Sequence, residues 1–397
     1  MTVARRLCYL DHAATTPLDP RVAAAMQPFT AEGWCGNPSS FHWAGRWSGG
    51  AVEEARQHVA ALLHARSQEI VFTGSGTESI NLALLGVMAG APGGHLVTTA
   101  IEHTAVLATA RHLERGGCAV TSLPVGADGL CDPQALRQAL RPDTRLVSIM
   151  AANHMVGTMQ PWAELARIAH EHGALFHTDA VQAAGKVPLD VGAASIDLLS
   201  LSAHKLRGPQ GVGALYVRRG LRLTPLIHGC GQEGGLRSGS ENVAGIVGFG
   251  RAAAIAEAEM DSEAARLTAL RDRIIDGVIA RVPATYLVGD RAHLLPGHLC
   301  LRFAGLRDDA LGLVLSLDIA GIAVSSGAAC GAPRGLEPGR VLAAMGLDPR
   351  TGGAAVRLSL GRGNDERDVE RLLDVLPQVV AAMRPRSPAA RLAAPAA

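Results

Sequence analysis

A lysine occupies a position where an open α/β sheet would hold a ligand. The apolar run from Asp197 to Leu201 predicts a strand, which leads through Ser202 and His204 directly to Lys205 and then to a Gly/Pro turn. Lysine is rarely buried, and such sheets bind their ligands beyond the carboxyl ends of the strands. By itself, however, a lysine here could be an ordinary solvated loop residue.

An acid at the end of the preceding predicted strand changes this interpretation. The apolar run Ala174–Thr178 leads directly to Asp179. A pyridoxal phosphate (PLP) site needs a lysine to form the Schiff base. It also needs an acid that keeps the pyridine nitrogen protonated, so that the ring can draw off carbanion charge. Asp179 and Lys205 at two successive strand ends therefore predict a PLP site.

A glycine turn follows another short apolar run and opens a predicted helix. In Phe72–Ser79, Ser75 and Glu78 have the spacing of a capping box, which alone could explain both residues. The same geometry points free backbone N–H groups at an anion, so Gly76 and its neighbours could also hold a phosphate. The stretch is not a Walker loop, because no Gly-Lys-Ser/Thr follows, and it misses the dinucleotide fingerprint, because Ser79 stands where the third glycine would be. Ser202 and His204 could supply further phosphate donors.

Two more residues have types and positions suited to chemistry. His103 follows the apolar run that ends at Thr99, so it joins the series of strand ends, and an imidazole suits proton transfer. Cys330 lies among small, turn-forming residues near Arg334, which would favour a thiolate. A small buried cysteine is the alternative interpretation. Among the seven cysteines we expect Cys330 to be the reactive thiol, with Cys230 second.

Alternating segments must position these residues. Apolar runs are separated by amphipathic helical patterns, which is typical of βα units around a mostly parallel sheet, an α/β fold. The expected strands are 70–73, 96–99, 119–123, 145–150, 174–178 and 197–201, and the expected helices are 52–65, 104–114, 133–140 and 162–172. A connecting helix over about 250–282, possibly broken once, then leads to strands at 299–303, 323–325 and 355–360.

This pattern predicts two domains, as expected for 397 residues. We expect a large PLP-binding domain over 16–252, a smaller α+β domain formed by 1–15 and 253–384, and a disordered tail over 385–397. A hydrophobic content of 48% and a net charge of +1 indicate a globular protein without an obligatory nucleic-acid or membrane partner. The dispersed cysteines predict reduced thiols in the cytoplasm, with no disulfide framework or metal site.

Several motifs in the same order identify a family resemblance. The chain resembles the PLP-dependent cysteine desulfurases of the NifS/IscS type, in the class V aminotransferase group of fold-type I. The resemblance runs from Tyr9–Thr16 to Val356–Gly361, and its most specific motifs are Ser202–Pro209, Gly231–Gly239 and Ser326–Cys330.

The resemblance implies a role for each matching residue. Lys205 would form the Schiff base, Asp179 would bind the pyridine nitrogen, and His103 would stack on the ring and move protons. The phosphate would be held by Gly76, Thr77, Ser202 and His204, with Ser240 reaching in from the second subunit of a homodimer. The ring oxygen would contact Asn153 and Gln182, and the substrate carboxylate would contact Asn37 and Arg357. Cys330 would be the nucleophile that takes the sulfur.

The implied reaction converts L-cysteine to L-alanine and leaves a persulfide on Cys330 for an acceptor protein. Iron–sulfur cluster assembly, tRNA thiolation and DNA phosphorothioation all use such sulfur donors. A selenocysteine lyase, another class V enzyme such as an aminotransferase, and a non-catalytic scaffold of the same fold are the alternatives. The chain departs from the family pattern at His12, His154, Met155, Cys230 and Ser240.

Overall fold

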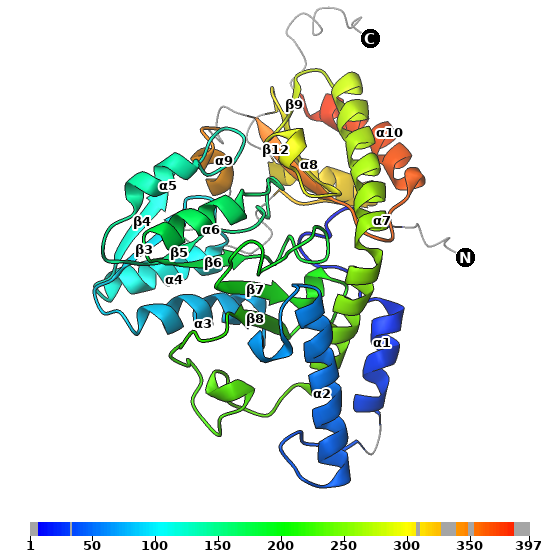
Figure 1. Cartoon of the computed structure of the whole chain (residues 1–397). Coiled ribbons are helices and arrows are strands. Elements are labelled where there is room, and N and C mark those ends of the chain that lie inside the picture. The colour runs from blue at the N-terminus through cyan, green and yellow to red at the C-terminus, as the bar shows by residue number, and fades with distance from the viewer. Residues whose placement is uncertain (1–6, 32–33, 307–309, 327–338, 348–352, 385–397) are drawn as a thin grey trace, which may run out of the picture.

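A seven-stranded sheet forms the centre of the larger part of the molecule (Figure 1). The computed structural model describes residues 7–31, 34–306, 310–326, 339–347 and 353–384. The strand order is β2-β8-β7-β6-β5-β3-β4, and all neighbours from β7 to β4 are parallel, whereas β8 runs antiparallel to β7 and β2. The strands are β2 (Ile70–Thr73), β3 (His95–Thr99), β4 (Ala119–Leu123), β5 (Thr144–Ser148), β6 (Leu175–Asp179), β7 (Leu198–Ser202) and β8 (Gly213–Val217).

Helices cover both faces of this sheet, which explains why its strands read as continuous apolar runs. Successive residues of β7 point to opposite faces, so Leu198 packs in one core and Leu199 in the other. The Leu198 core includes α3 (Gly76–Met88) and α4 (Thr104–Arg115). The Leu199 core includes α2 (Trp43–Ala61), α5 (Pro133–Ala139), α6 (Trp162–Glu171) and the first half of α7 (Val243–Arg281).

A smaller part packs around the second half of α7, which passes from one part to the other (Figure 1). Its antiparallel sheet has the order β12-β10-β9, and β1 pairs in parallel with β11 beside it. These strands are β1 (Cys8–Tyr9), β9 (Thr285–Leu287), β10 (His298–Phe303), β11 (Ile322–Ala323) and β12 (Ala354–Ser359). The remaining helices are α1 (Pro20–Met26), α8 (Ala310–Ile319), α9 (Arg340–Ala344) and α10 (Glu366–Met383).

The predicted α/β fold is confirmed, and the expected strands lie within two residues of those observed. The helix predictions need two corrections. The connecting helix α7 is a single 39-residue helix that begins earlier, at Val243, where the Asn242 side chain caps it by accepting from the Gly245 N–H. Helix α2 also begins earlier, at Trp43. Both starts contain several glycines, which have a low helix propensity, so the composition there does not indicate a helix.

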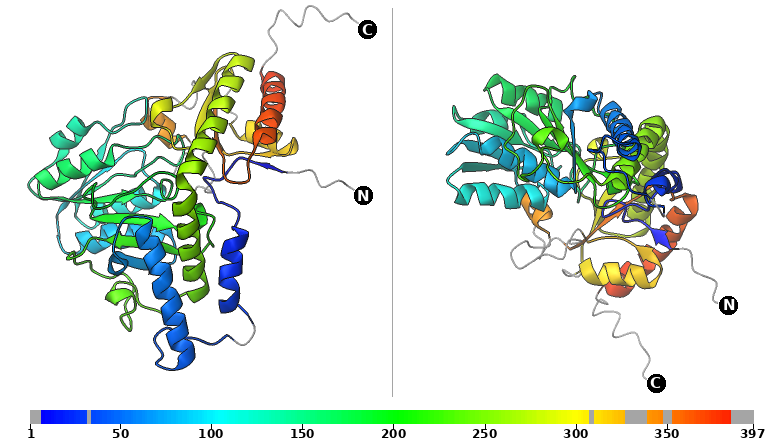
Figure 2. Two further views of the ribbon diagram at one scale, coloured as in Figure 1. Left: turned by 45° about the vertical axis from the view of Figure 1, so that its right-hand side comes forward. Right: turned by 90° about the horizontal axis from the view of Figure 1, so that it is seen from below.

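Helices α2, α1 and α7 pack side by side (Figure 2), and this close packing requires a glycine at one position of α7. A Cβ atom at Gly250 of α7 would lie only 2.4 Å from the Cα of Ala55 on α2, so the two helices meet at a distance that excludes any side chain. No helix in the described part of the chain is both long and apolar enough to span a bilayer. The predicted domain boundaries at 16 and 252 stay a prediction, and the tail 385–397 lies outside the described residues.

Candidate active site

Three predicted site residues lie together at one edge of the large sheet. Asp179 is the last residue of β6, Lys205 ends a short 3₁₀ turn directly after β7, and His103 follows β3 as the N-cap of α4. They are close enough to shift one another's pKa values electrostatically. Burial raises the pKa of Asp179, and the neighbouring His103 and Lys205 oppose that effect. The parallel strands therefore bring an acid, an amine and an imidazole to one place.

The N-terminal segment holds the Lys205 turn. The Lys205 Nζ donates to the carbonyl oxygens of Ala13 and Ala14, at 2.6 Å in each case. The Thr16 Oγ1 donates to the His204 carbonyl at 2.7 Å and accepts from the Arg207 N–H at 2.9 Å. These bonds explain why a polar turn near the N-terminus belongs to the motif set, because it holds the Lys205 amine from 191 and 192 positions away in the sequence.

The hydrogen bonds of His103 define its tautomer. Its Nδ1 accepts from the Ala105 N–H at 3.1 Å, so in the neutral ring the proton is on Nε2. Burial lowers the pKa of His103 below its ordinary value, Asp179 opposes this shift, and Lys205 adds to it. A second imidazole, that of His154, contacts the ring edge to face, with centroids 5.5 Å apart. The result is a neutral imidazole that is able to exchange a proton through Nε2.

The start of α3 provides a place for an anion. The Ser75 side chain caps the helix by accepting from the Glu78 N–H at 3.1 Å, as predicted. The other half of the expected capping box is absent from this pair, because the Glu78 carboxylate accepts from Gly74 instead, at 2.8 Å. A Cβ at Gly76 would come within 2.9 Å of the Val181 side chain, so glycine lets this helix end approach the edge that carries Asp179. Backbone N–H groups at such an end favour a phosphate.

Asn153 and Gln182, which we expect near the ring oxygen, both form hydrogen bonds within the protein. Asn153 accepts through Oδ1 from the Met155 and Val156 N–H groups at 2.8 and 3.0 Å, and its Nδ2 donates to the Ile101 carbonyl at 2.9 Å. It therefore holds a tight turn beneath the site. Gln182 donates through Nε2 to the Ala13 carbonyl at 2.9 Å, the same oxygen that accepts from Lys205. Of the two, Gln182 thus shares a hydrogen-bond acceptor with Lys205.

Arg357 of β12 reaches the site from the smaller part. Its side chain is buried and forms an ion pair with Asp11, with Nη2 and Oδ1 at 2.6 Å. Its Nη1 donates to the His154 carbonyl at 2.9 Å, whereas the buried Nε has no hydrogen-bond partner. A guanidinium held in this way suits a carboxylate ligand. Asn37, by contrast, shows a local contact, in which its Oδ1 accepts from the Ser39 N–H at 2.9 Å.

The loop from Gly231 to Ser240 is anchored to α2, β2 and α3. Glu233 is buried against Arg56, with two hydrogen bonds of 2.7 and 2.8 Å, and it also accepts from the Phe72 N–H. Arg237 pairs with Glu78 of α3 at 3.0 Å. Ser240, the predicted phosphate contact, is exposed at the end of this loop. In contrast, Ser202 is buried at the end of β7.

The thiols differ in their environment. Cys330 and the loop around it lie outside the described residues, so its role stays a prediction. Among the described cysteines, burial raises the pKa of Cys131 and of Cys300 to about 12, which disfavours a thiolate at both positions. Cys230, the second choice for a reactive thiol, is exposed.

Three residues near the site were missed from the sequence. Glu102 is fully buried beside Asp179, Asp11 pairs with Arg357, and Lys186 contacts Gln182. A signal existed for Glu102, which directly precedes His103, and for Asp11, which lies in the N-terminal motif.

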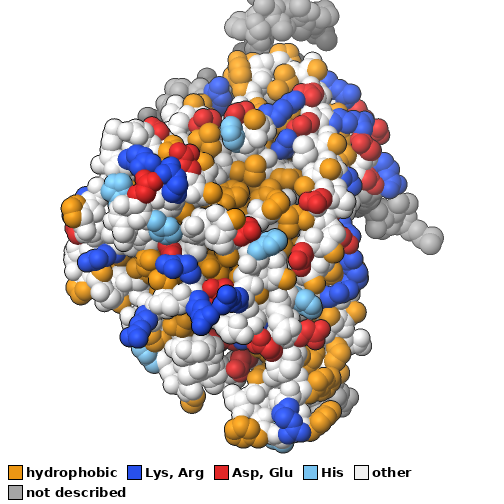
Figure 3. Space-filling model, in the orientation of Figure 1, with side chains coloured by type: hydrophobic (Ala, Val, Ile, Leu, Met, Phe, Trp, Pro, Cys, Tyr) orange, Lys and Arg blue, Asp and Glu red, His pale blue; other side chains and the backbone are white. Residues whose placement is uncertain are grey.

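Charged side chains of both signs are mixed over the face drawn in Figure 3, with no large region of one sign.

Comparisons with known proteins find similar sequences and structures over nearly the whole chain. Residues 8–372 match the family described as aminotransferase class-V. The chain is 46% identical over 386 residues to "Cysteine desulfurase IscS" of Dictyoglomus turgidum, covering 97% of each chain. The solved structure of a "NIFS-LIKE PROTEIN" has a TM-score of 0.88 at 38% identity, covering 95% of this chain and 100% of that one. "SspA in complex with cysteine" has a TM-score of 0.78 at 36% identity, covering 89% and 98%.

Proposed function

Because the chain belongs to the class V aminotransferase family, we propose that it is a cysteine desulfurase, which takes sulfur from L-cysteine and leaves L-alanine. The family resemblance expected from the motifs is thus confirmed. One observation carries the proposal for this site: an acid, an amine and a neutral imidazole meet at the carboxyl ends of β6, β7 and β3, next to a helix N-terminus suited to a phosphate. The full-length similarity to named desulfurases supports the reaction.

The residues present fit PLP as the resident cofactor. The buried Asp179 suits a protonated pyridine nitrogen. Because Gly76 lacks a Cβ, the N-terminus of α3 can approach Val181 and Ser202, and its backbone N–H groups suit a phosphate. When bound, PLP supplies an electron sink for charge that develops at the substrate carbon. We propose that it is held by Gly76, Thr77, His103, Asn153, Asp179, Gln182, Ser202, His204, Lys205 and, from the second subunit, Ser240.

The chain's own groups bind the substrate and move its protons. Arg357, fixed by Asp11, holds the substrate carboxylate, with Asn37 as the second predicted contact. The Lys205 amine takes the proton from the substrate Cα, and His103 exchanges a proton through Nε2. These roles use groups that are already oriented by the N-terminal segment and by the cap of α4.

Cys330 completes the reaction as a thiolate. Its sulfur attacks the sulfur of the substrate, so an S–S bond forms and the Cβ–S bond breaks with its electron pair left on carbon. A proton delivered to that carbon gives alanine, and Cys330 keeps the sulfur as a persulfide. The persulfide then passes to an acceptor protein, and a reducing compartment such as the cytoplasm keeps the thiol available.

The proposal includes a homodimer in which each subunit completes its partner's site. The loop that carries Ser240 is tied firmly to its own subunit through Glu233 and Arg237, yet Ser240 itself is exposed. A rigid loop with an exposed hydroxyl is suited to contact a second copy of the chain.

Within each subunit we assign cofactor binding to residues 16–252, and residues 1–15 with 253–384 to the smaller domain.

The decisive experiment supplies L-cysteine without any oxo acid. We expect stoichiometric alanine and a persulfide on Cys330, identified by mass spectrometry after alkylation. The Cys330→Ser variant should retain PLP but form neither product, whereas the matched variant Cys230→Ser should behave like the wild type. A requirement for an oxo acid would identify an aminotransferase, turnover confined to selenocysteine would identify a lyase for that substrate, and failure to retain PLP would indicate a scaffold.

A further inference from the structure

The chain uses lysine at only two positions. Of its 37 Lys and Arg side chains, all are arginines except Lys186 and Lys205. Arginine serves wherever a permanent positive charge is needed, whereas a lysine amine can lose its proton when it is buried. Two lysines in such a chain mark positions where a titratable amine is used. Lys205 has a role in the proposed reaction, but Lys186 does not.

Both lysines line the same cavity of about 100 Å³, which lies between the Lys205 turn, α7 and the segment after β12. The Lys186 Nζ donates to the Gln182 Oε1 at 3.3 Å, and the Gln182 Nε2 donates to the Ala13 carbonyl at 2.9 Å. The same carbonyl accepts from the Lys205 Nζ at 2.6 Å. A single amide and a single carbonyl thus connect the two amines.

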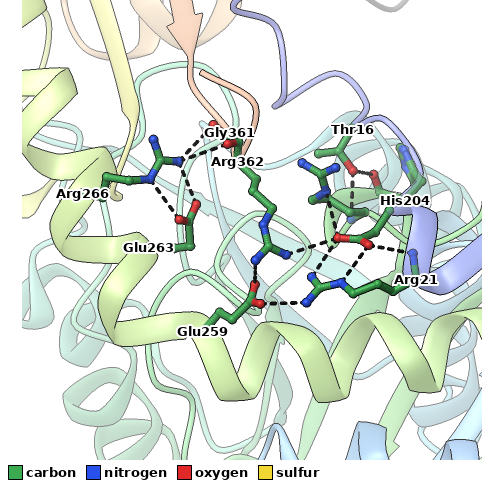
Figure 4. A network of polar contacts seen from close by, with 10 residues as sticks. Thr16, Arg21, His204, Glu259, Glu263, Arg266, Gly361 and Arg362 are labelled. Atoms are coloured by element: carbon green, nitrogen blue, oxygen red, sulfur yellow. Dashed lines mark hydrogen bonds and ion pairs between the residues drawn. The ribbon is translucent and has the colours of Figure 1, made fainter. Parts of the chain in front are cut away.

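The carboxylates of this cavity are already paired with arginines (Figure 4). Asp19 pairs with Arg21 at 2.9 Å and with Arg362 at 3.2 Å, and Glu259 pairs with the same two arginines. Glu263 pairs with Arg266 at 2.8 Å. Within the described ranges, the Lys186 amine has no carboxylate at ion-pair distance, and its acceptor is the uncharged Gln182.

The charges around Lys186 are therefore mostly positive. Burial, together with the positive charges of Lys205 and Arg357, lowers the pKa of Lys186 to about 7. His12, on the N-terminal segment, has its pKa lowered to about 4 by burial and then by Lys186, so it is neutral at neutral pH. The other charged or titratable groups near the cavity are Asp19, Arg207, Glu259, Glu263, His298 and Arg362.

We propose that Lys186 and Lys205 share the positive charge of this cavity. In the free chain Lys205 is the ammonium, held by two carbonyls, and Lys186 is largely neutral near physiological pH. When Lys205 gives up its charge to react, Lys186 binds a proton from solvent, so that the carbonyls of the N-terminal segment still face a cation. Lys186 is thus a positioning residue that also orients the Gln182 amide, since an ammonium can only donate to Oε1.

The consequence for catalysis rests on the proposed role of Lys205, but the charge sharing can be measured on the chain itself. Full-length protein without cofactor, labelled with [ε-¹³C]lysine, should give two side-chain signals, which the Lys186→Met variant assigns. In the wild type, the Lys186 signal should titrate near pH 7. In Lys205→Met, its midpoint should rise by about 1 pH unit, because a neighbouring like charge has been removed.

A second variant tests the reverse direction. Lys186→Arg cannot lose its charge, so it should lower the midpoint of Lys205 by about 1 pH unit relative to Lys186→Met. Arg137→Met, which removes an exposed charge from α5, is the matched control and should move neither midpoint. A Lys186 midpoint close to that of an ordinary lysine, or a midpoint unaffected by Lys205→Met, would overturn charge sharing. Loss of activity in Lys205→Met with unshifted midpoints would leave the desulfurase proposal intact.

Discussion

The buried carboxyl of Glu102 allows a sharp prediction about stability. It is fully buried directly before His103, and its Oε1 accepts from the Thr99 hydroxyl at 2.7 Å and from the Met150 N–H at 3.0 Å. Its Oε2 is buried without a hydrogen-bond partner. Burial raises the pKa of Glu102 to about 8, and the nearby Asp179 contributes to the increase. The folded chain therefore holds this carboxyl in its protonated form at neutral pH.

The size and sign of the effect follow from proton linkage. Glu102 has an ordinary pKa of 4.5 and a folded pKa of about 8. Between these values the folded chain binds a proton that the unfolded chain does not, so stability is fully present below about pH 4.5 and falls as the pH rises to 8. At about 1.4 kcal/mol per pKa unit, the total loss is roughly 4–5 kcal/mol.

The test compares Glu102→Gln with the wild type by urea unfolding from about pH 5 to pH 9. A glutamine amide resembles the protonated acid, and its oxygen can still accept from Thr99 and Met150. We expect the variant to gain stability relative to the wild type by about 1.4 kcal/mol per pH unit up to pH 8. Glu164→Gln on the exposed face of α6 is the control and should show no such trend. Parallel stability curves for Glu102→Gln and the wild type would refute the reasoning.

Three further predictions concern the site. His103→Asn should retain the cofactor and the cap of α4 but slow turnover by roughly 10²–10⁴-fold; a wild-type rate would make His103 structural. Asp11→Asn leaves the buried Arg357 without its counterion, so it should lower the free energy of unfolding by about 3 kcal/mol in a thermal unfolding measurement. It should also raise KM for cysteine more than it lowers kcat. An unchanged KM would argue against Arg357 as the carboxylate ligand. Ser240→Ala should weaken PLP retention in dialysis, and mixing it with Lys205→Ala subunits should restore one complete site per hybrid dimer; no recovery after verified subunit exchange would exclude a shared site.

The sequence predicted the part of the site that follows from parallel strands. Asp179, Lys205 and His103 each come directly after an apolar run, and the carboxyl ends of parallel strands meet at one edge of the sheet. Strand positions were predictable for a related reason. Strands covered on both faces are short and rich in apolar residues, so they contrast with the amphipathic helices between them.

Contacts between distant segments were beyond the sequence pattern. Asp11 and Arg357 are separated by 346 positions, and nothing in either segment indicates its partner. The protonated state of Glu102 and the low pKa of Lys186 depend on burial, which is a property of the folded packing. The early starts of α2 and α7 depend on the side-chain caps of His42 and Asn242, which accept from the N–H groups of Gly45 and Gly245.

The N-terminal segment from Asp11 to Thr16 connects the two halves of the proposed reaction. Its first residue fixes Arg357, the expected ligand of the substrate carboxylate, in the smaller part of the molecule. Two residues later, the Ala13 carbonyl binds both Lys205 and Gln182 in the larger part. These contacts lie within three residues of the chain. A displacement of Arg357 would therefore be transmitted to the Lys205 amine through one short turn of the backbone. The groups proposed for substrate binding and for proton removal are therefore both held by residues of this segment.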